Sequence, residues 1–229
     1  MDNASKFLQI YKDLESWMKE KVAKNGYIDF PGMISELRGT NRQIHTNYTF
    51  LKKMGDLRNV ITHEKTVIAQ PCDEVIREFR KLAESIMMPP KLMQFCAKDP
   101  SALSKDVLLP TVLHYMCEYD YSQVIVQDNG EYRLLSREGI SKWIEANIET
   151  DIVSIKETKV AEILTHEDKV NCKYVDRSTD VFTFLDIIGD AKRRVQAIIV
   201  TEHGKANEKP IGIATAWDAG VIIKEMNIA

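Results

Sequence analysis

The sequence predicts an α/β (α+β) protein in two parts: an N-terminal helical bundle, then a tandem pair of small α/β repeats related by a pseudo-twofold axis. Three observations predict this arrangement. Apolar residues up to position 90 follow only the helical period, short strands around turn residues appear after Pro89-Pro90, and the second half of the chain repeats itself. We expect the bundle at residues 1–90, the first repeat at 91–150 and the second at 151–229.

The composition is that of a soluble globular protein. Of the 229 residues, 44% are hydrophobic and 28% are charged, and no apolar run approaches the ~20 residues that span a bilayer. The N-terminus lacks the basic and apolar stretches of a secretory signal. Four cysteines without a C-x-x-C pair indicate reduced thiols, with neither a metal site nor a disulfide framework. We therefore expect a cytoplasmic protein that does not bind membranes.

Charge differs between the two parts. Residues 1–99 contain 16 Lys and Arg against 13 Asp and Glu, whereas residues 100–229 contain 15 against 21. This asymmetry fits two modules with different surfaces. It does not by itself support RNA binding, because phosphate contacts need clustered cations.

Helical periodicity defines the first part. Residues 4–24 place Phe7, Leu14 and Met18 on one stripe, and Asn25-Gly26 ends that helix. We expect a short helix within 31–39, one longer helix over 41–61 and another over 73–87. A bundle of this size often dimerises to complete its core.

The second part contains two hairpins and an internal repeat. "SQVIVQDNGEYRLLS" (122–136) is a pair of strands around Asn129-Gly130, and "VQAIIVTEHGKANEKPIGIAT" (195–215) is a second pair. Ser-x-Asp-Val opens a helical pattern twice, at 104–107 and at 178–181, and predicts an N-cap arrangement at the start of each helix. The unit helix–strand–helix–strand–strand–helix is thus used twice, which would leave two equivalent clefts between the copies.

One stretch, "PIGIATAWDAG" (210–220), places Thr215 and Asp218 where a strand leads into a helix. Such a pair either caps the helix by accepting from free N–H groups, or holds a ligand. A carboxylate accepts two hydrogen bonds from a cis-diol, and the helix N-terminus attracts phosphate. Trp217 either stacks on a base or packs against the protein.

The repeat and this motif resemble the CBS domain pair, or Bateman module, over residues ~91–229. Family members often carry Gly-hydrophobic-x-Thr/Ser-x-x-Asp at this junction, and residues 212–218 match it in full. The resemblance implies that Asp218 binds ribose hydroxyls and Thr215 the sugar or phosphate, with Ile213 and Trp217 beside them. It implies an adenosine-type regulatory ligand, such as AMP, ADP, ATP or S-adenosylmethionine, and no required cofactor.

The first repeat departs from this motif. Its equivalent stretch keeps the hydroxyl as Ser136, but Gly139 stands in place of the aspartate and Arg133 in place of the glycine. We expect at most one complete nucleotide cleft, around Thr215 and Asp218. The other is either empty or binds something else through Arg137.

In the first part, Arg58-Asn59-Val60-Ile61-Thr62-His63 resembles the motif of HEPN domains, over residues ~1–88. That resemblance implies a dimer and, in many members, a metal-independent ribonuclease. His63 would then act on a ribose 2′-hydroxyl, Arg58 would stabilise the phosphate and Asn59 would orient both. The alternative is structural, because Arg58 and His63 would point about 140° apart on a continuous helix.

Together these patterns predict a cytoplasmic regulator, expected as a homodimer, whose CBS pair senses an adenine nucleotide or related adenosyl ligand and controls the helical domain. The alternative is a ligand-regulated ribonuclease acting through Arg58 and His63. The sequence holds no Walker loop, G-x-S-x-G or H-E-x-x-H motif that would predict another enzyme class.

Overall fold

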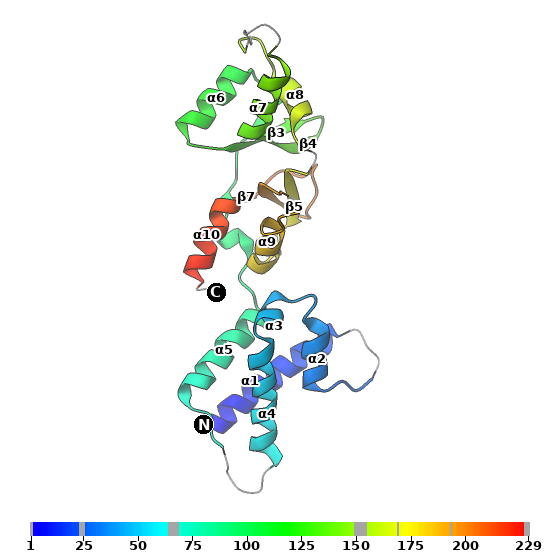
Figure 1. Cartoon of the computed structure of the whole chain (residues 1–229), viewed down its shortest axis with the longest axis vertical. Coiled ribbons are helices and arrows are strands. Elements are labelled where there is room, and N and C mark those ends of the chain that lie inside the picture. Colours follow the sequence, from blue (N-terminus) through cyan, green and yellow to red (C-terminus); the bar gives the residue numbers. More distant parts are fainter. Residues whose placement is uncertain are drawn as a thin grey trace. The chain divides into compact units, whose positions relative to one another are not determined.

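The structure, a computed structural model, describes residues 2–22, 26–63, 69–148, 155–168, 170–192 and 194–226, apart from the side chain of His63. The chain divides into two compact units, Met1–Pro90 and Lys91–Ala229, which we describe separately (Figure 1). Within the described residues, no helix combines the length and apolar character that a bilayer crossing requires.

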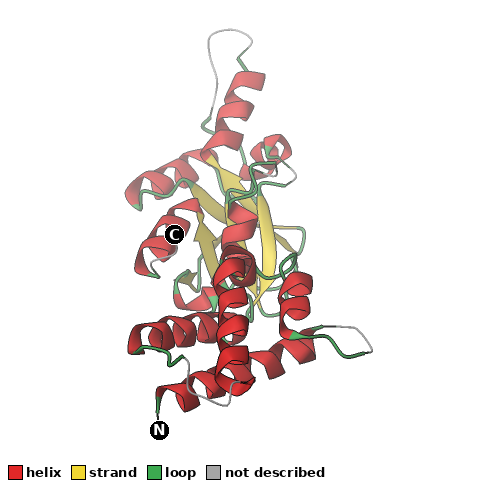
Figure 2. Ribbon diagram, turned by 60° about the horizontal axis from the view of Figure 1, so that its bottom comes forward, coloured by secondary structure: helices red, strands yellow, loops and turns green. Residues whose placement is uncertain are grey.

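The described residues of the N-terminal unit form helices joined by turns and loops (Figure 2). The helices are α1 (Asn3–Lys21), α2 (Phe30–Leu37), α3 (Arg42–Thr46), α4 (Tyr48–His63) and α5 (Asp73–Met87). Asp2 and Asp29 cap α1 and α2 by accepting from backbone N–H groups. The predicted stripe of α1 is confirmed: Phe7, Leu14 and Met18 are fully buried in a single core with side chains of the other helices.

The expectation of one long helix over residues 41–61 is wrong. The chain forms α3 and α4 instead, with Asn47 between them. Both the backbone N–H and the side-chain amide of Asn47 donate to the carbonyl of Gln43, at 3.0 and 2.9 Å. A side chain that competes for a backbone acceptor in this way ends a helix, and the period of apolar residues does not reveal it.

The C-terminal unit repeats one order of elements, as predicted. The first copy has the 3₁₀ turn η1 (Leu92–Gln94), β2 (Ala102–Ser104), α6 (Leu109–Glu118), β3 (Gln123–Asp128), β4 (Glu131–Ser136) and α7 (Arg137–Ala146). The second has α8 (Val160–Ile163) with η2 (Leu164–His166), β5 (Cys172–Asp176), α9 (Val181–Ile188), β6 (Ala197–Thr201), β7 (Gly212–Thr215) and α10 (Ala216–Glu225). A further short strand, β1 (Ala97–Lys98), precedes β2.

The strands form two sheets, ordered β2-β3-β4 and β1-β7-β6-β5. In each sheet a parallel pair adjoins an antiparallel hairpin. Asn129 and Gly130 have φ values of 50° and 86°, as the turn of the predicted first hairpin requires. Both predicted hairpins are confirmed.

Each repeat contributes its leading segment to the other repeat. β1 follows η1 in the leading segment of the first repeat, yet it pairs with β7 of the second, Ala97 opposite Ile213. The start of η1 bridges Lys91 to Asp180, and the start of α8 bridges Lys159 to Leu108. The two copies are therefore interlocked, and a side chain from one leading segment can complete a site on the other copy.

The predicted N-cap arrangement is confirmed at residues 178–181 but is wrong at 104–107. Asp180 accepts from the N–H groups of Phe182 and Thr183 at the start of α9. Asp106 instead binds Lys159, and α6 begins two residues later, behind Leu108. The bridge between Leu108 and Lys159 holds this stretch extended, so the tertiary contact overrides the capping pattern.

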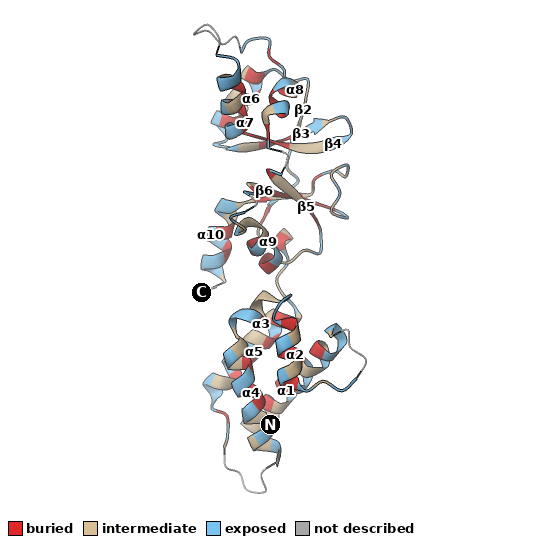
Figure 3. Ribbon diagram, turned by 45° about the vertical axis from the view of Figure 1, so that its right-hand side comes forward, coloured by how far each residue is buried: buried red, intermediate tan, exposed pale blue. Residues whose placement is uncertain are grey.

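Apolar residues alternate between the two faces of each sheet. Val124 and Val126 of β3 belong to a core formed with α6, α7 and α8, and Ile198 and Val200 of β6 belong to a core formed with α9 and α10. Figure 3 colours the buried residues of the strands and helices red. The intervening residue Ile125 is also buried, although it belongs to neither core. Both faces of β3 are therefore covered, and the second face lines the cavity described next.

Candidate functional site

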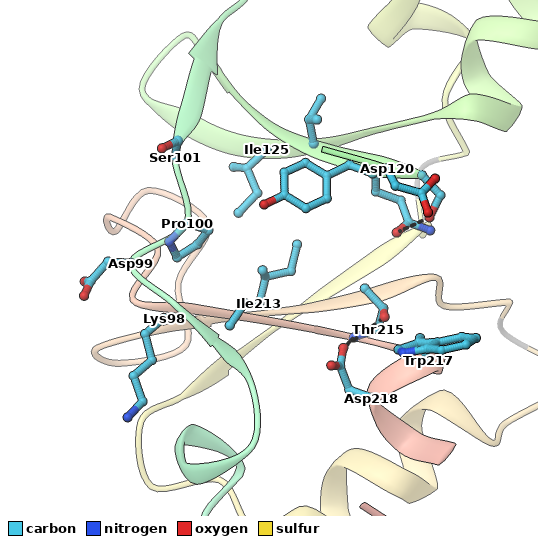
Figure 4. Close-up of a pocket in the computed structure, with 15 residues that line it drawn as sticks. Lys98, Asp99, Pro100, Ser101, Asp120, Ile125, Ile213, Thr215, Trp217 and Asp218 are labelled. Carbon is cyan, nitrogen blue, oxygen red and sulfur yellow. Dashed lines mark hydrogen bonds between the residues drawn. The ribbon is translucent and has the colours of Figure 1, made fainter. Parts of the chain in front are cut away.

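A cavity of about 710 Å³ lies between the two repeats of the C-terminal unit. Ile125 of β3 and Ile213 of β7 face one another across it, as Figure 4 shows. Its wall also includes the loop before β3 and the leading segment with β1. The lining residues are Ala97, Lys98, Asp99, Pro100, Ser101, Asp120, Tyr121, Ser122, Gln123, Val124, Ile125, Ile213, Thr215, Trp217 and Asp218.

Thr215 and Asp218 meet at one end of this cavity, where β7 passes into α10 (Figure 4). Asp218 Oδ2 accepts from the backbone N–H of Thr215 at 2.6 Å and from its hydroxyl at 2.9 Å. The pair is thus a helix cap, one of the two roles that the sequence left open. Both bonds use Oδ2, and within the described residues Oδ1 has no hydrogen-bond partner.

Gly212, the first residue of the motif, is required by close packing. A Cβ there would lie 2.7 Å from Cys96 Sγ and 3.0 Å from Met93 Sδ. Both sulfur atoms belong to the leading segment of the first repeat. The glycine therefore permits the contact between this segment and β7 that holds one wall of the cavity.

Trp217 is 83% exposed, although it lines the cavity. An indole on the first turn of a helix usually packs on the protein, and this one does not. Tyr121 lines the same cavity and forms a ring cluster with Tyr115 and Tyr119. The cavity therefore offers two aromatic rings to a planar group.

The charged lining residues differ in direction. Lys98 and Asp99 point away from the cavity in Figure 4. Asp120 pairs with Arg137, whose Nη2 lies 3.6 Å from Asp120 Oδ1. The backbone N–H of Arg137 donates to the carbonyl of Ser122, another lining residue. The structure thus brings Arg137 beside the same cavity as Thr215 and Asp218.

The sequence did not single out Asp120, Tyr121 or the leading segment. The backbone distinguishes two of these lining residues: Asp99, in the leading segment, and Asp120 have left-handed conformations, with φ values of 48° and 52°. Such values are uncommon outside glycine. Arg194 occupies the position in the second repeat that corresponds to Asp120, and it also has positive φ, 46°.

Ser136, the hydroxyl residue of the first repeat, does not line this cavity. It is only 2% exposed and caps α7 by accepting from the N–H of Gly139. Its own N–H and hydroxyl donate to the carboxylate of Glu167, at 2.5 and 3.0 Å. Burial raises the pKa of Glu167, although its hydrogen bonds from Ser136 and Asn171 act to lower it.

The residues of the proposed ribonuclease motif lie in α4. Arg58 donates to the side-chain oxygen of Asn59 at 3.2 Å, and its guanidinium lies 5.6 Å from the ring centre of Tyr11. The helix continues to His63, so Arg58 and His63 occupy helical positions five apart. The side chain of His63 lies outside the described residues. Within these residues, His, Cys, Asp and Glu form no group of three or more that could hold a metal ion.

No protein-family model matches this sequence, and no curated protein sequence is similar to it. Solved structures are similar to the C-terminal part. CBSX2 in complex with AMP has a TM-score of 0.45 and 14% identity, over 60% of this chain and 98% of that one. The CBS domain pair of protein MJ0100, in complex with 5′-methylthioadenosine and S-adenosyl-L-methionine, has a TM-score of 0.46 and 12% identity, over 60% and 98%. CbpB in complex with c-di-AMP has a TM-score of 0.48 and 16% identity, over 68% and 95%.

The topology of the chain itself defines its fold. Two copies of one βαββα order follow each other, each leading segment joins the opposite copy, and a cavity lies between them. This is the architecture that the sequence resemblance predicted. The C-terminal unit is a CBS-type domain pair in its fold.

Proposed function

We propose that the C-terminal unit senses an adenosine-type ligand in the cavity between its repeats. One observation carries this: Asp218 presents a carboxylate at the end of a cavity that Ile125 and Ile213 also line, and within the described residues only its Oδ2 accepts hydrogen bonds. Oδ1 is then available to accept from a ribose hydroxyl. A carboxylate oxygen is a stronger acceptor than a neutral oxygen, which suits recognition of a diol.

The neighbouring residues suggest roles for the rest of the ligand. Ile125 and Ile213 offer apolar walls to a purine, and Trp217 offers an exposed face for stacking. The start of α10 and the guanidinium of Arg137, which pairs with the lining residue Asp120, offer positive charge to a phosphate. Since Arg137 already pairs with Asp120, a phosphate would have to compete with that carboxylate.

A ligand in this cavity would contact both repeats, because β3 belongs to one and β7 to the other. Its binding would favour the arrangement of the repeats that fits it best. We propose that this bias is passed to the N-terminal helical unit, and that the protein acts as a homodimer. Sedimentation equilibrium with and without AMP would test whether the dimer exists and responds.

Thermal shift with AMP, ADP, ATP and S-adenosylmethionine tests the ligand class. AMP and S-adenosylmethionine are the first choices, since they occupy the structures of CBSX2 and of the MJ0100 pair. A ligand at about 100 times its dissociation constant should raise the melting temperature by several degrees. No stabilisation by any of the four would contradict the proposal.

Asp218→Asn is the sharpest variant for this screen. Its amide oxygen can still cap α10, but the second oxygen is replaced by an NH₂ group that cannot accept. Asp180→Asn is the matched control, because Asp180 also caps a helix of the second repeat and does not line the cavity. The shift should be lost in Asp218→Asn and kept in Asp180→Asn.

The ribonuclease alternative needs its own assay. The bond between Arg58 and Asn59 is the observation in its favour, since it orients the guanidinium. Metal-free cleavage of a single-stranded RNA, abolished in His63→Ala and unaffected in the control His45→Ala, would support it. Absence of cleavage with and without AMP would exclude it.

A further inference from the structure

The first repeat lacks the motif aspartate, yet a carboxylate stands at the equivalent place. Glu167, at the end of the leading segment of the second repeat, accepts from the N–H of Ser136 at 2.5 Å and from its hydroxyl at 3.0 Å. Asp218 makes the same two bonds with the N–H and hydroxyl of Thr215. In the first repeat the carboxylate thus comes from the interlocked segment instead of the helix, while the hydroxyl stands at the same position in both repeats.

Gly139 is what makes room for this exchange. A Cβ at Gly139 would lie 2.0 Å from Glu167 Oε1 and 2.3 Å from its Cδ, so any other residue there would displace that carboxylate from its hydrogen bonds. In the second repeat the arrangement is reversed. Asp218 stands on the helix, and the leading segment supplies a small side chain, the buried thiol of Cys96, whose pKa is raised by burial and further by the charge of Asp218.

Glu167 is fully engaged within the protein. Besides the two bonds to Oε1, Oε2 accepts from the Ser136 hydroxyl at 3.0 Å and from Asn171 Nδ2 at 2.7 Å. The residue is 9% exposed. Whereas Asp218 keeps one oxygen for a ligand, both oxygens of Glu167 are taken.

Two further contacts tie the same region together. Gln196 donates to Glu138 at 2.9 Å, which links the approach to β6 with the first turn of α7. Lys142 of α7 pairs with Asp168, the neighbour of Glu167, at 2.9 Å. Side chains of the two repeats are therefore joined on either side of Glu167.

We propose that Glu167 is a built-in occupant of the second cleft, which replaces the motif carboxylate and closes that cleft to ligands. The pair then has one ligand site per chain, and the closed cleft fastens the leading segment of the second repeat to α7. This is independent of what the open cavity binds, since it concerns contacts that exist without a ligand.

A double-mutant cycle on Gly139 and Glu167 tests the inference by thermal unfolding of the full chain. Gly139→Ala should lower the melting temperature by about 5 °C or more, as expected for overpacking at a buried site. Gly220→Ala is the matched control, because Gly220 lies in α10 with open space around its Cβ position, and it should leave the melting temperature unchanged or slightly raised. In a Glu167→Ala background, Gly139→Ala should cost nothing further.

A second variant, which moves the carboxylate from residue 167 to residue 139, keeps the test decisive if Glu167→Ala fails to fold. Gly139→Asp combined with Glu167→Ala returns the carboxylate to the helix, as in the second repeat, and should recover the stability that Glu167→Ala loses. Three results would overturn the proposal: Gly139→Ala tolerated as well as Gly220→Ala, additive losses in the cycle, or no recovery in this second variant.

Discussion

The two repeats of the CBS-type pair bind a carboxylate at the same strand-to-helix junction, but the carboxylate comes from different parts of the chain. In each, a hydroxyl residue ends a strand and caps the next helix, and a carboxylate binds both its N–H and its hydroxyl. At Thr215 the carboxylate is three residues away on the same helix, whereas at Ser136 it comes from Glu167, 31 residues along the chain. The local acid, Asp218, lies at the end of the cavity, and we propose that the distant acid, Glu167, closes the equivalent cleft of the first repeat.

The comparison teaches that the position of a carboxylate matters as much as its presence. Asp218 reaches the cap from the helix and keeps Oδ1 beside a cavity of about 710 Å³. Glu167 reaches the cap from the leading segment of the second repeat, occupies the space beside Gly139 and accepts hydrogen bonds through both oxygens. We propose that the same hydrogen bonds therefore accompany opposite consequences for ligand binding.

The largest expected effect comes from giving the first repeat a second carboxylate. Gly139→Asp in the wild-type background would place its side chain on Glu167 and bring two acids together in a buried site. We expect a loss of about 3 kcal/mol or more in the free energy of unfolding, measured by urea denaturation. Gly220→Asp, on the exposed part of α10, should cost far less.

Replacing Trp143 and Trp217 in turn by alanine should separate a residue of the core from a residue that binds the ligand. Trp143 of α7 is 5% exposed, so Trp143→Ala should cost about 3 kcal/mol of stability. Trp217→Ala should change stability by less than about 0.5 kcal/mol, yet weaken AMP binding by about 1–2 kcal/mol through lost stacking. Quenching of tryptophan fluorescence by AMP, lost in Trp217→Ala, would report the contact. Unchanged affinity in Trp217→Ala would remove Trp217 from the site.

Glu167 should also make the free energy of unfolding depend on pH. Burial raises the pKa of Glu167 above its ordinary value of 4.5, so the folded state holds this proton more tightly than the unfolded state. The stability that this group contributes is present below pH 4.5 and is lost as pH rises through the raised pKa. The stability of the wild type relative to Glu167→Gln should therefore fall over that window and level off above it. A difference independent of pH would show that Glu167 does not titrate as a buried acid.

The smallest effect is expected at Arg137. Its pair with Asp120 is exposed, so Arg137→Ala should alter stability by no more than about 0.5 kcal/mol. If the guanidinium meets a phosphate, binding of AMP should weaken several-fold while binding of adenosine stays the same. Equal losses for AMP and adenosine would contradict that role.

Much of this fold could be predicted from the sequence, because its signals are local. The helical stripe of α1, the Asn129-Gly130 turn and the hairpins each depend on residues a few positions apart. Thr215 and Asp218 could be singled out for the same reason, since a cap and a motif are both short; their role toward a ligand stays a prediction. The break at Asn47 and the late start of α6 were missed because a side-chain competitor and a cross-repeat bridge determine them.

Glu167 could not be found in this way. The sequence shows that Gly139 replaced an aspartate, but the replacement carboxylate reaches Ser136 only because the leading segments are interlocked. No spacing rule connects residues 136 and 167. Likewise, the sequence placed Arg137 at the second cleft, and its pair with Asp120 brings it to the first.

Isothermal titration with AMP tests the central claim, one open cleft and one closed, most directly. We expect one AMP per chain in the wild type, no binding in Asp218→Asn, and one AMP per chain in the control Asp180→Asn. Two AMP molecules per chain would contradict a closed second cleft. Binding that persists unchanged in Asp218→Asn, or no binding of AMP at all, would contradict the assignment of the open cavity to a nucleotide.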